Sequence, residues 1–193
     1  MSQNHQNVEE QAALERQAPN TSKQIYQGRA ISIRVDTITT PDGLTYQREI
    51  VEHPGAVVMI PVDQAGRILL VRQWRRAAQQ ILLELPAGTL ERGEEPIACA
   101  QRELQEEIGY AADKITPLGG FFSAPGFCNE YLHLFLAEEW QEKPLAADED
   151  EHIEVVSKTM EEALAMIEQG LICDAKTIAG ISRYYLRKEA RNI

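Results

Sequence analysis

The amino-acid sequence predicts an α/β (α+β) sandwich in which helices cover both faces of a β-sheet. Three observations lead to this prediction. Short apolar or alternating segments follow one another from residue 24 to residue 86, an amphipathic helical segment begins near residue 94, and further strands and two helical segments come after it. Strands and helices in this mixed order pack as layers around one core. The length of 193 residues fits one ordinary domain with a small appendage.

The N-terminal part is expected to be a polar tail followed by a β-hairpin. Residues 1–22 are rich in Gln, Asn, Glu and Ser, a composition that favours a flexible tail. Apolar alternation predicts a strand within residues 24–38, and Pro41-Asp42-Gly43 predicts a turn before a returning strand at residues 46–52. The chain is therefore divided into a tail (1–22), an N-terminal β-segment (23–54) and a main domain (55–193).

The main domain is expected to place strands before and after one long helix. Strands are predicted where apolar and β-branched residues run between turn signals. Helices are predicted where the apolar residues recur with the period of an α-helix. The predicted strands cover residues 56–62, 67–74, 81–86, 118–122, 131–139 and 152–157, and the later helices cover residues 160–169 and 175–188.

The predicted helix that begins near Glu94-Glu95-Pro96 carries three glutamates on one side. Glu103, Glu106 and Glu107 stand at positions i, i+3 and i+4, which share one helix face. Solvated carboxylates at this spacing repel one another by roughly a few tenths of a kcal/mol per pair, yet no lysine occurs in this helix or in the loop before it. A bound divalent cation would turn this repulsion into attraction, and oxygen ligands favour Mg²⁺ or Mn²⁺ over zinc. The alternative is an acidic helix face that is merely solvated.

Composition and charge restrict the partners that the protein can have. The net charge of −11 disfavours non-specific binding to nucleic acid and to anionic membranes. No apolar run of about 18 residues is present, and the polar N-terminus lacks the regions of a signal peptide. Cys99, Cys128 and Cys173 are odd in number and widely spaced, which argues against a disulfide framework or a zinc site. We expect a cytoplasmic protein with a small-molecule partner and no nucleic-acid or membrane partner.

The segment from Gly88 to Tyr110 reads GTLERGEEPIACAQRELQEEIGY. Five residues separate Gly88 from Glu94, and seven separate Glu94 from the run that begins at Arg102. This long spaced pattern resembles the Nudix box, the signature of hydrolases that cleave nucleoside diphosphates linked to another group. Its fixed positions are filled, and Tyr110 is a mild departure because the family usually has an aliphatic residue there.

Further segments resemble the ADP-ribose pyrophosphatase branch of the Nudix hydrolases, so that the resemblance covers most of the chain beyond the tail. Residues 48–57 (REIVEHPGAV) resemble the lead into the core domain of that branch. Residues 71–75 (VRQWR) resemble a strand end whose last arginine touches the substrate, and residues 84–88 (ELPAG) resemble the lead into the box. Pro125 lies sixteen positions after Gly109, an offset that is the usual marker of the ADP-ribose branch.

This resemblance implies a fold, an assembly and a reaction. The fold would be the α/β/α Nudix sandwich, and the protein would be a homodimer in which the N-terminal β-segment exchanges with the partner. An ordinary edge hairpin packed on its own chain is the alternative for that segment. The reaction would be metal-dependent hydrolysis of the pyrophosphate bond of ADP-ribose or related ADP-sugars, giving AMP and ribose 5-phosphate.

The resemblance also implies which residues bind metal and which take part in catalysis. Carboxylates of the box and one backbone carbonyl before it would hold Mg²⁺ or Mn²⁺. A general base would come from the acidic loop at residues 148–151, for which a solvated loop is the alternative. The implied metal ligands are Ala87, Glu103, Glu106, Glu107 and Glu151, and the implied catalytic residues are Glu106, Glu107 and the general base Glu149.

The substrate-binding residues implied by the resemblance lie outside the box. Arg75 would grip the diphosphate, because arginine suits bidentate contact with phosphate, and Arg72 and Arg76 are the alternatives. Arg48 would reach the substrate in the partner's site if the N-terminal segment is exchanged. Pro125 would be a substrate-binding residue. Glu130 would contact the terminal ribose, although it could equally be an ordinary charge at a strand end.

Two other functions remain open from the sequence. The first is hydrolysis of GDP-mannose or of a broader set of nucleoside diphosphate sugars, because the box holds the diphosphate and not the base or the sugar. The second belongs to another class, a Nudix protein that binds ADP-ribose and regulates transcription. The intact box disfavours the second function.

Overall fold

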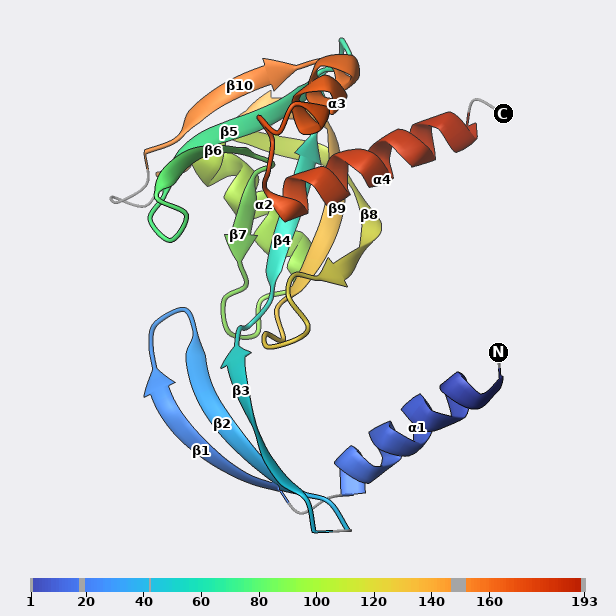
Figure 1. Cartoon of the computed structure of the whole chain (residues 1–193). Helices are drawn as coiled ribbons and strands as arrows, with labels where there is room; N and C mark the ends of the chain where they lie inside the picture. Colours follow the sequence, from blue (N-terminus) through green and yellow to red (C-terminus); the bar gives the residue numbers. More distant parts are fainter. Residues whose placement is uncertain (1, 18–19, 42, 147–151, 192–193) are drawn as a thin grey trace. The chain divides into compact units, whose positions relative to one another are not determined.

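A computed structural model describes residues 2–17, 20–41, 43–146 and 152–191 (Figure 1). The chain separates into two compact units. The first contains the residues up to His53 together with Ala124–Glu130, and the second contains Pro54–Ser123 and the residues from Tyr131 onward. The loop that carries Pro125 and Glu130 therefore belongs to the same unit as the N-terminal strands.

The first unit consists of a helix and a three-stranded antiparallel sheet. Its elements are α1 (Ser2–Gln17), β1 (Asn20–Gln27), β2 (Ser32–Thr39) and β3 (Thr45–Glu52), and the strand order is β1-β2-β3. The sequence predicted one strand across residues 24–38, whereas the structure has two, because the Gly28 amide donates to the Ile31 carbonyl at 2.9 Å and turns the chain back. Where composition favoured a flexible tail, the structure has α1 and the start of β1. Gln, Glu and Ala are good helix formers, so the same composition is compatible with a helix.

The loop at residues 124–130 pairs with the end of β3 inside the first unit. The Val51 amide donates to the Phe127 carbonyl at 2.7 Å, and the Asn129 amide donates to the Val51 carbonyl at 3.2 Å. The side chain of Asn129 also accepts from the His53 amide at 2.8 Å. These bonds attach the loop to the strand even though more than 70 residues separate them in the sequence.

The second unit contains two sheets. The four-stranded sheet has the order β7-β4-β9-β8, in which β4 and β9 are parallel and the other pairs are antiparallel. The three-stranded sheet has the order β10-β5-β6 and is antiparallel. The strands are β4 (Ala56–Pro61), β5 (Ile68–Arg75), β6 (Gln80–Glu84), β7 (Ala87–Thr89), β8 (Tyr110–Phe122), β9 (Tyr131–Glu142) and β10 (Glu154–Lys158).

Strand β8 is much longer than the sequence predicted. We expected a strand only at residues 118–122, but β8 begins at Tyr110, directly after Gly109. Gly109 has φ +79°, a left-handed conformation that ends the preceding helix without the strain a side chain would bring. Exposed Asp113 and Lys114 interrupt the apolar pattern, which explains why periodicity missed the first half of the strand.

Helices cover both faces of the central strands, as predicted. On β4, Val58 and Ile60 pack into one apolar cluster with Ile181 of α4 (Ala175–Arg191) and Met160 of α3 (Met160–Glu168). The alternate residues Val57 and Met59 pack into a second cluster with Leu104 of α2 (Pro96–Glu107). Successive side chains of a strand point to opposite faces of the sheet, so β4 packs against helices on both sides. Among the helices that the structure describes, none is long and apolar enough to cross a membrane.

Candidate metal and phosphate site

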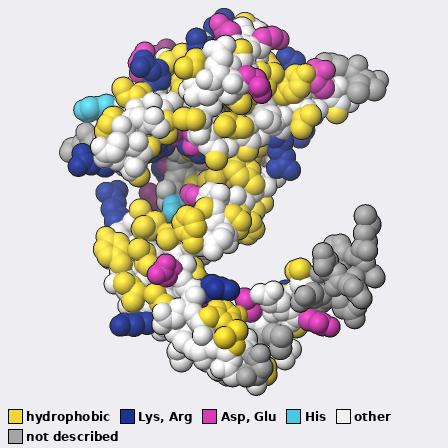
Figure 2. Space-filling model, in the orientation of Figure 1, with side chains coloured by type: hydrophobic (Ala, Val, Ile, Leu, Met, Phe, Trp, Pro, Cys, Tyr) yellow, Lys and Arg dark blue, Asp and Glu magenta, His cyan; other side chains and the backbone are white. Residues whose placement is uncertain are grey.

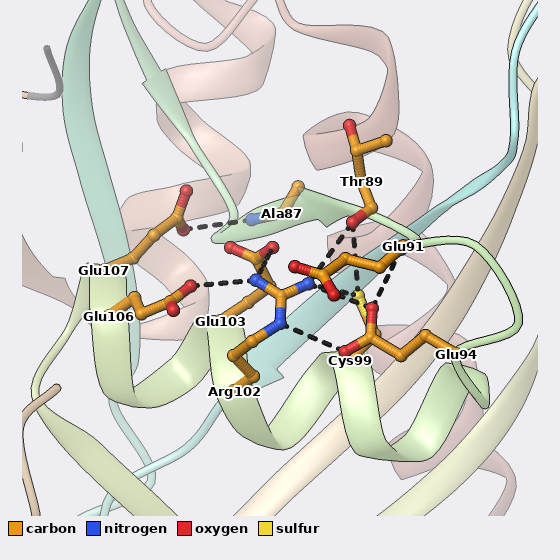
Figure 3. A network of polar contacts seen from close by, with 9 residues as sticks. All are labelled: Ala87, Thr89, Glu91, Glu94, Cys99, Arg102, Glu103, Glu106 and Glu107. Atoms are coloured by element: carbon orange, nitrogen blue, oxygen red, sulfur yellow. Dashed lines mark hydrogen bonds and ion pairs between the residues drawn. The ribbon is translucent and has the colours of Figure 1, made fainter. Parts of the chain in front are cut away.

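Helix α2 is anchored by its apolar side and presents its carboxylates to strand β7. It begins at Pro96, where the missing N–H costs no helical hydrogen bond. Cys99, Ala100 and Leu104 are buried against the central strands. Glu103, Glu106 and Glu107 consequently lie on the side of α2 that faces Ala87 and Thr89, as Figure 3 shows.

Arg102 lies at the centre of this acidic cluster. Its Nη1 atom donates to Glu103 at 2.7 Å and to Glu106 at 2.9 Å. Its Nε and Nη2 atoms donate to the two carboxylate oxygens of Glu94, both at 3.0 Å (Figure 3). Arg102 therefore contacts three carboxylates of the box, and its bidentate partner is Glu94. One guanidinium thus holds four oxygen atoms from three acids in fixed positions.

The loop before α2 is attached to the same arginine. The Glu94 carboxylate accepts from the Glu91 amide at 3.0 Å, and Arg102 Nη2 also reaches the Thr89 carbonyl at 3.3 Å. The Cys99 thiol beneath it contacts Arg102 Nη2 at 3.3 Å. Glu94 and Arg102 therefore connect β7, the following loop and α2, which accounts for their fixed spacing in the sequence.

Two glutamates are placed by the backbone of β7. The Glu107 carboxylate accepts from the Ala87 amide at 3.1 Å and is buried. The Glu103 carboxylate lies against Gly88 so closely that a Cβ atom there would stand 1.7 Å from Glu103 Cδ. Gly88 is needed in the box because any side chain would occupy the space that Glu103 fills.

The electrostatics of the cluster follow from these contacts. Hydrogen bonds from Arg102 lower the pKa of Glu94 to about 2. Hydrogen bonds to Glu94 and the charge of Glu103 raise the pKa of Arg102 above its usual value. Burial, together with the neighbouring Glu94 carboxylate, raises the pKa of the Cys99 thiol to about 12. Glu94 and Arg102 are thus ionised at neutral pH, and Cys99 is an unreactive thiol beside them.

The residues of the cluster suit a hard divalent cation by their chemistry. Carboxylates and a backbone carbonyl are the ligands that Mg²⁺ and Mn²⁺ prefer. Three carboxylates (Glu94, Glu103 and Glu106) pair with a single guanidinium, and a fourth, Glu107, accepts from a backbone amide, which leaves an excess of negative charge. As they lie, no three His, Cys, Asp or Glu side chains in the described part of the chain converge on one metal position. Arg102 and the Ala87 amide donate hydrogen bonds to the carboxylate oxygens instead.

Arg75, the residue expected to grip the diphosphate, ends strand β5 in the second unit. Its Nε and Nη2 atoms donate to the two oxygens of Glu84 at 2.8 and 2.7 Å. The hydrogen bond to Glu84 and the charges of Glu84, Glu107 and Asp174 raise the pKa of Arg75. Arg75 therefore lies within the electrostatic reach of Glu107, a box carboxylate. Arg72, its alternative, pairs with exposed Glu154 at 2.6 Å.

The remaining expected residues belong to the first unit or are not described. Arg48, Pro125 and Glu130 all lie in the first unit. The Arg48 guanidinium stands 4.5 Å from the centre of the Tyr46 ring. Glu130 lies 3.6 Å from His53, and Pro125 is exposed. The expected general base Glu149 and the expected metal contact Glu151 lie outside the described residues.

The sequence pattern, the fold and the carboxylate cluster agree with one protein family. A model of the NUDIX domain matches residues 52–179. The chain belongs to the NUDIX family. This match spans β4, the whole of α2 and the start of α4, so it covers both the carboxylate cluster and the strands that hold it. The chain is therefore a Nudix hydrolase, with the predicted α/β/α arrangement.

Individual relatives cover nearly the whole of this NUDIX protein. It is 44% identical over 170 residues to an ADP-ribose pyrophosphatase from Bacillus subtilis, covering 87% of this chain and 91% of the relative. It is 38% identical over 173 residues to a methanol dehydrogenase activator from Bacillus methanolicus, covering 89% of this chain and 94% of the relative. A solved structure of an ADP compounds hydrolase superposes with a TM-score of 0.80 at 18% identity, covering 90% of this chain and 95% of that one. At this identity the last comparison establishes the fold.

The sequence analysis gave no role to Glu84 or to Lys176. Glu84 is fully buried and contacts both Arg75 and Lys176. A signal for it was present in the sequence, because Glu84 is the one charge within the apolar run ILLELP. A charged residue in a buried strand is rarely tolerated without a partner. No comparable signal exists for Lys176, which lies at the start of a distant helix.

Proposed function

We propose that this Nudix protein hydrolyses the pyrophosphate bond of ADP-ribose, giving AMP and ribose 5-phosphate. The observation that carries this proposal is the carboxylate cluster of α2 and β7, in a chain that is 44% identical to an ADP-ribose pyrophosphatase along most of its length. The carboxylate cluster suits a diphosphate. The choice of ADP-ribose as the substrate rests on the relative, which is an ADP-ribose pyrophosphatase. The location we propose is the cytoplasm, which is consistent with three free cysteines.

The proposed cofactor is Mg²⁺ or Mn²⁺. Glu103, Glu106 and Glu107 would hold it, together with the backbone carbonyl of Ala87. When bound, the cation supplies positive charge that stabilises the negative charge developing on the diphosphate oxygens. Arg102 is bonded to Glu103 and Glu106 and fixes their positions on the helix. Glu107 is fixed by the Ala87 amide, so the chain itself sets the directions of the three carboxylates.

The chain's other residues would position substrate and water. Arg75 would bind the diphosphate with the part of its guanidinium that does not face Glu84. Arg48, Pro125 and Glu130 would contact the remainder of the substrate. Glu149 would accept a proton from the attacking water, and Glu151 would complete the metal site. The in-line displacement at phosphorus needs positioned groups and charge stabilisation rather than a covalent intermediate.

The assembly we propose is a homodimer formed through the N-terminal sheet. Strand β1 is exposed along its whole length, and the large apolar side chains of Ile25 and Tyr26 are each 53% exposed. Figure 2 shows hydrophobic side chains at the surface of this sheet. A three-stranded sheet with an exposed apolar edge needs a covering partner. A second copy of the chain would cover it.

The test of the reaction is the release of AMP from ADP-ribose by the purified protein with Mg²⁺ or Mn²⁺. Folded protein that releases no AMP with either metal would refute the proposal. The assay should include GDP-mannose, UDP-glucose and NADH, because a carboxylate cluster suits a diphosphate whatever base or sugar is attached to it. A higher kcat/KM for the release of GMP from GDP-mannose than for the release of AMP from ADP-ribose would identify the protein as a GDP-mannose hydrolase.

A second candidate function follows from the Bacillus methanolicus relative, whose name is that of a methanol dehydrogenase activator. The 38% identity over 89% of this chain favours testing the same role here. Purified protein would be added to a methanol dehydrogenase from that organism, with and without Mg²⁺. A higher initial rate of methanol oxidation would support activation, and an unchanged rate would leave hydrolysis as the sole function proposed.

A further inference from the structure

Glu84 is a buried carboxylate to which the proposed hydrolytic chemistry gives no direct role. It is the last residue of β6, and its side chain is only 1% exposed. Burial acts to raise the pKa of Glu84, but the hydrogen bonds and charges of Arg75 and Lys176 outweigh it and hold that pKa below its ordinary value. A buried ionised carboxylate is tolerated only when its partners are well placed. Its partners therefore indicate what it does.

Glu84 and Arg75 are joined by two parallel hydrogen bonds. Both oxygens of the carboxylate accept from two adjacent nitrogens of the guanidinium, Nε and Nη2, at 2.8 and 2.7 Å. This paired geometry fixes the plane of the guanidinium as well as its position. The Arg75 side chain remains 39% exposed, so part of it is accessible to a ligand.

Glu84 is itself held by the start of helix α4. Lys176 Nζ contacts the Glu84 carboxylate and lies 3.0 Å from Asp174. Asp174 also accepts from the Thr177 hydroxyl at 2.6 Å and from the Thr177 amide at 3.0 Å. The Thr177 hydroxyl in turn accepts from the Leu85 amide at 2.8 Å. The residues that lead into the box are thereby joined to α4 on both sides of the Glu84–Leu85 peptide.

We propose that Glu84 is a positioning residue, which holds the guanidinium of Arg75 so that it is presented to the diphosphate of the substrate. This inference rests on the proposed function and assigns the orientation of Arg75 to the buried carboxylate of Glu84. Lys176 offsets the buried charge of Glu84, and Asp174 pairs with Lys176 in turn. Arg75 would act on the substrate, and Glu84 would act only through Arg75.

A double-mutant cycle tests this assignment. Glu84→Gln keeps the volume but loses the charge and one acceptor, so Arg75 should move by a fraction of an ångström to an ångström. Misplacement on that scale lowers kcat/KM for ADP-ribose by up to about 100-fold. Arg75→Met should lower kcat/KM at least as much, and the double variant should be no worse than Arg75→Met alone. Losses that multiply in the double variant would overturn the proposal.

Two further variants separate positioning from stability. Lys176→Met removes a charge from the same buried group but leaves the paired Arg75–Glu84 contact, so it should lower Tm while keeping most of kcat/KM. Glu154→Gln breaks the ion pair of Arg72 on the same strand and should change neither quantity appreciably. Loss of activity in Lys176→Met equal to that in Glu84→Gln would overturn the proposal, because stability alone would then explain both.

A measurement independent of catalysis distinguishes failure of this inference from failure of the proposed function. Exchange of the Arg75 Nε–H with solvent, followed by NMR, should be slow in the wild-type protein and at least tenfold faster in Glu84→Gln. Fast exchange in the wild type would overturn the proposal whatever the activity. If the wild type releases no AMP, the proposed reaction fails, and the same cycle is measured by ADP-ribose binding in a calorimeter with Mg²⁺. Absence of binding would overturn both.

Discussion

The carboxylate of Glu103 fills the space in which a side chain at Gly88 would stand. A Cβ atom on Gly88 would lie 1.7 Å from Glu103 Cδ and 2.0 Å from Oε1. No real contact is this short, so a side chain there must displace the carboxylate. Since Arg102 also holds Glu103 at 2.7 Å, the displacement would disturb the whole acidic cluster.

We therefore expect Gly88→Ala to lower activity far more than stability. The displaced Glu103 should reduce kcat/KM for ADP-ribose by about 100-fold, with a loss of unfolding free energy of about 1–3 kcal/mol from overpacking. Gly66→Ala is the matched control. Gly66 has φ +78° and open space around its Cβ, so the control should cost about 1–2 kcal/mol of stability and no activity. Equal activities of the two variants would contradict the assignment of Glu103.

Glu107→Gln should separate the charge of Glu107 from its structural role. The amide oxygen of Gln can still accept from the Ala87 amide, so the fold and Tm should be nearly unchanged. Loss of the negative charge should lower kcat by about 100- to 1,000-fold if Glu107 binds the catalytic cation. The measurement is AMP release over a titration of Mg²⁺, with thermal unfolding of the same sample. Glu95→Gln, which changes an exposed acid just before α2, should behave as wild type. Near-normal turnover of Glu107→Gln would refute its role as a ligand.

The Glu94–Arg102 pair should make stability depend on pH in the acid range. The pKa of Glu94 is about 2 in the folded protein, below its ordinary value of 4.5, so the pair contributes full stability above about pH 4.5. The contribution is lost as pH falls from there through about 2, because the unfolded chain then binds the proton more readily. The difference in unfolding free energy between wild type and Glu94→Gln, measured by urea titration, should be largest at pH 5–7 and shrink towards pH 2–3. A difference that is constant with pH would show that the charge of Glu94 contributes nothing.

Replacing an exposed apolar residue of β1 should weaken the proposed dimer. Ile25→Lys removes an exposed apolar side chain that the proposed interface would bury and puts a charge in its place. We expect the mass measured by light scattering at micromolar concentration to fall from that of a dimer towards that of a monomer. Gln27→Lys adds the same charge to a polar position of this strand and should leave the mass unchanged. A wild-type protein that is monomeric under these conditions would contradict the dimer itself.

The limits of the sequence analysis are visible in particular residues. Periodicity found the helix of the box and the buried strands, since these patterns are local and strongly apolar. It missed the first half of β8, where Asp113 and Lys114 break the pattern, and it did not separate β1 from β2. Composition favoured a flexible tail where the structure has α1, because residues that are typical of polar tails are also good helix formers.

The site residues divide in the same way. The sequence identified Glu103, Glu106 and Glu107 because their spacing alone places them on one helix face. It also identified Arg75 as a ligand of phosphate, but not the carboxylate that holds Arg75. Glu84 and Lys176 are 92 residues apart, and only the packing of α4 against the strands brings them together.

The sequence by itself determined the family, the box helix and the three carboxylates that it carries, because local spacing decides which side chains share a face. The tertiary structure decided which arginine pairs with which carboxylate. Arg102 binds Glu94 across a loop, Arg75 binds Glu84 across a strand pair, and Glu103 fits against β7 only because residue 88 has no side chain. These pairings depend on how distant segments pack, and a linear pattern does not record the distance between segments.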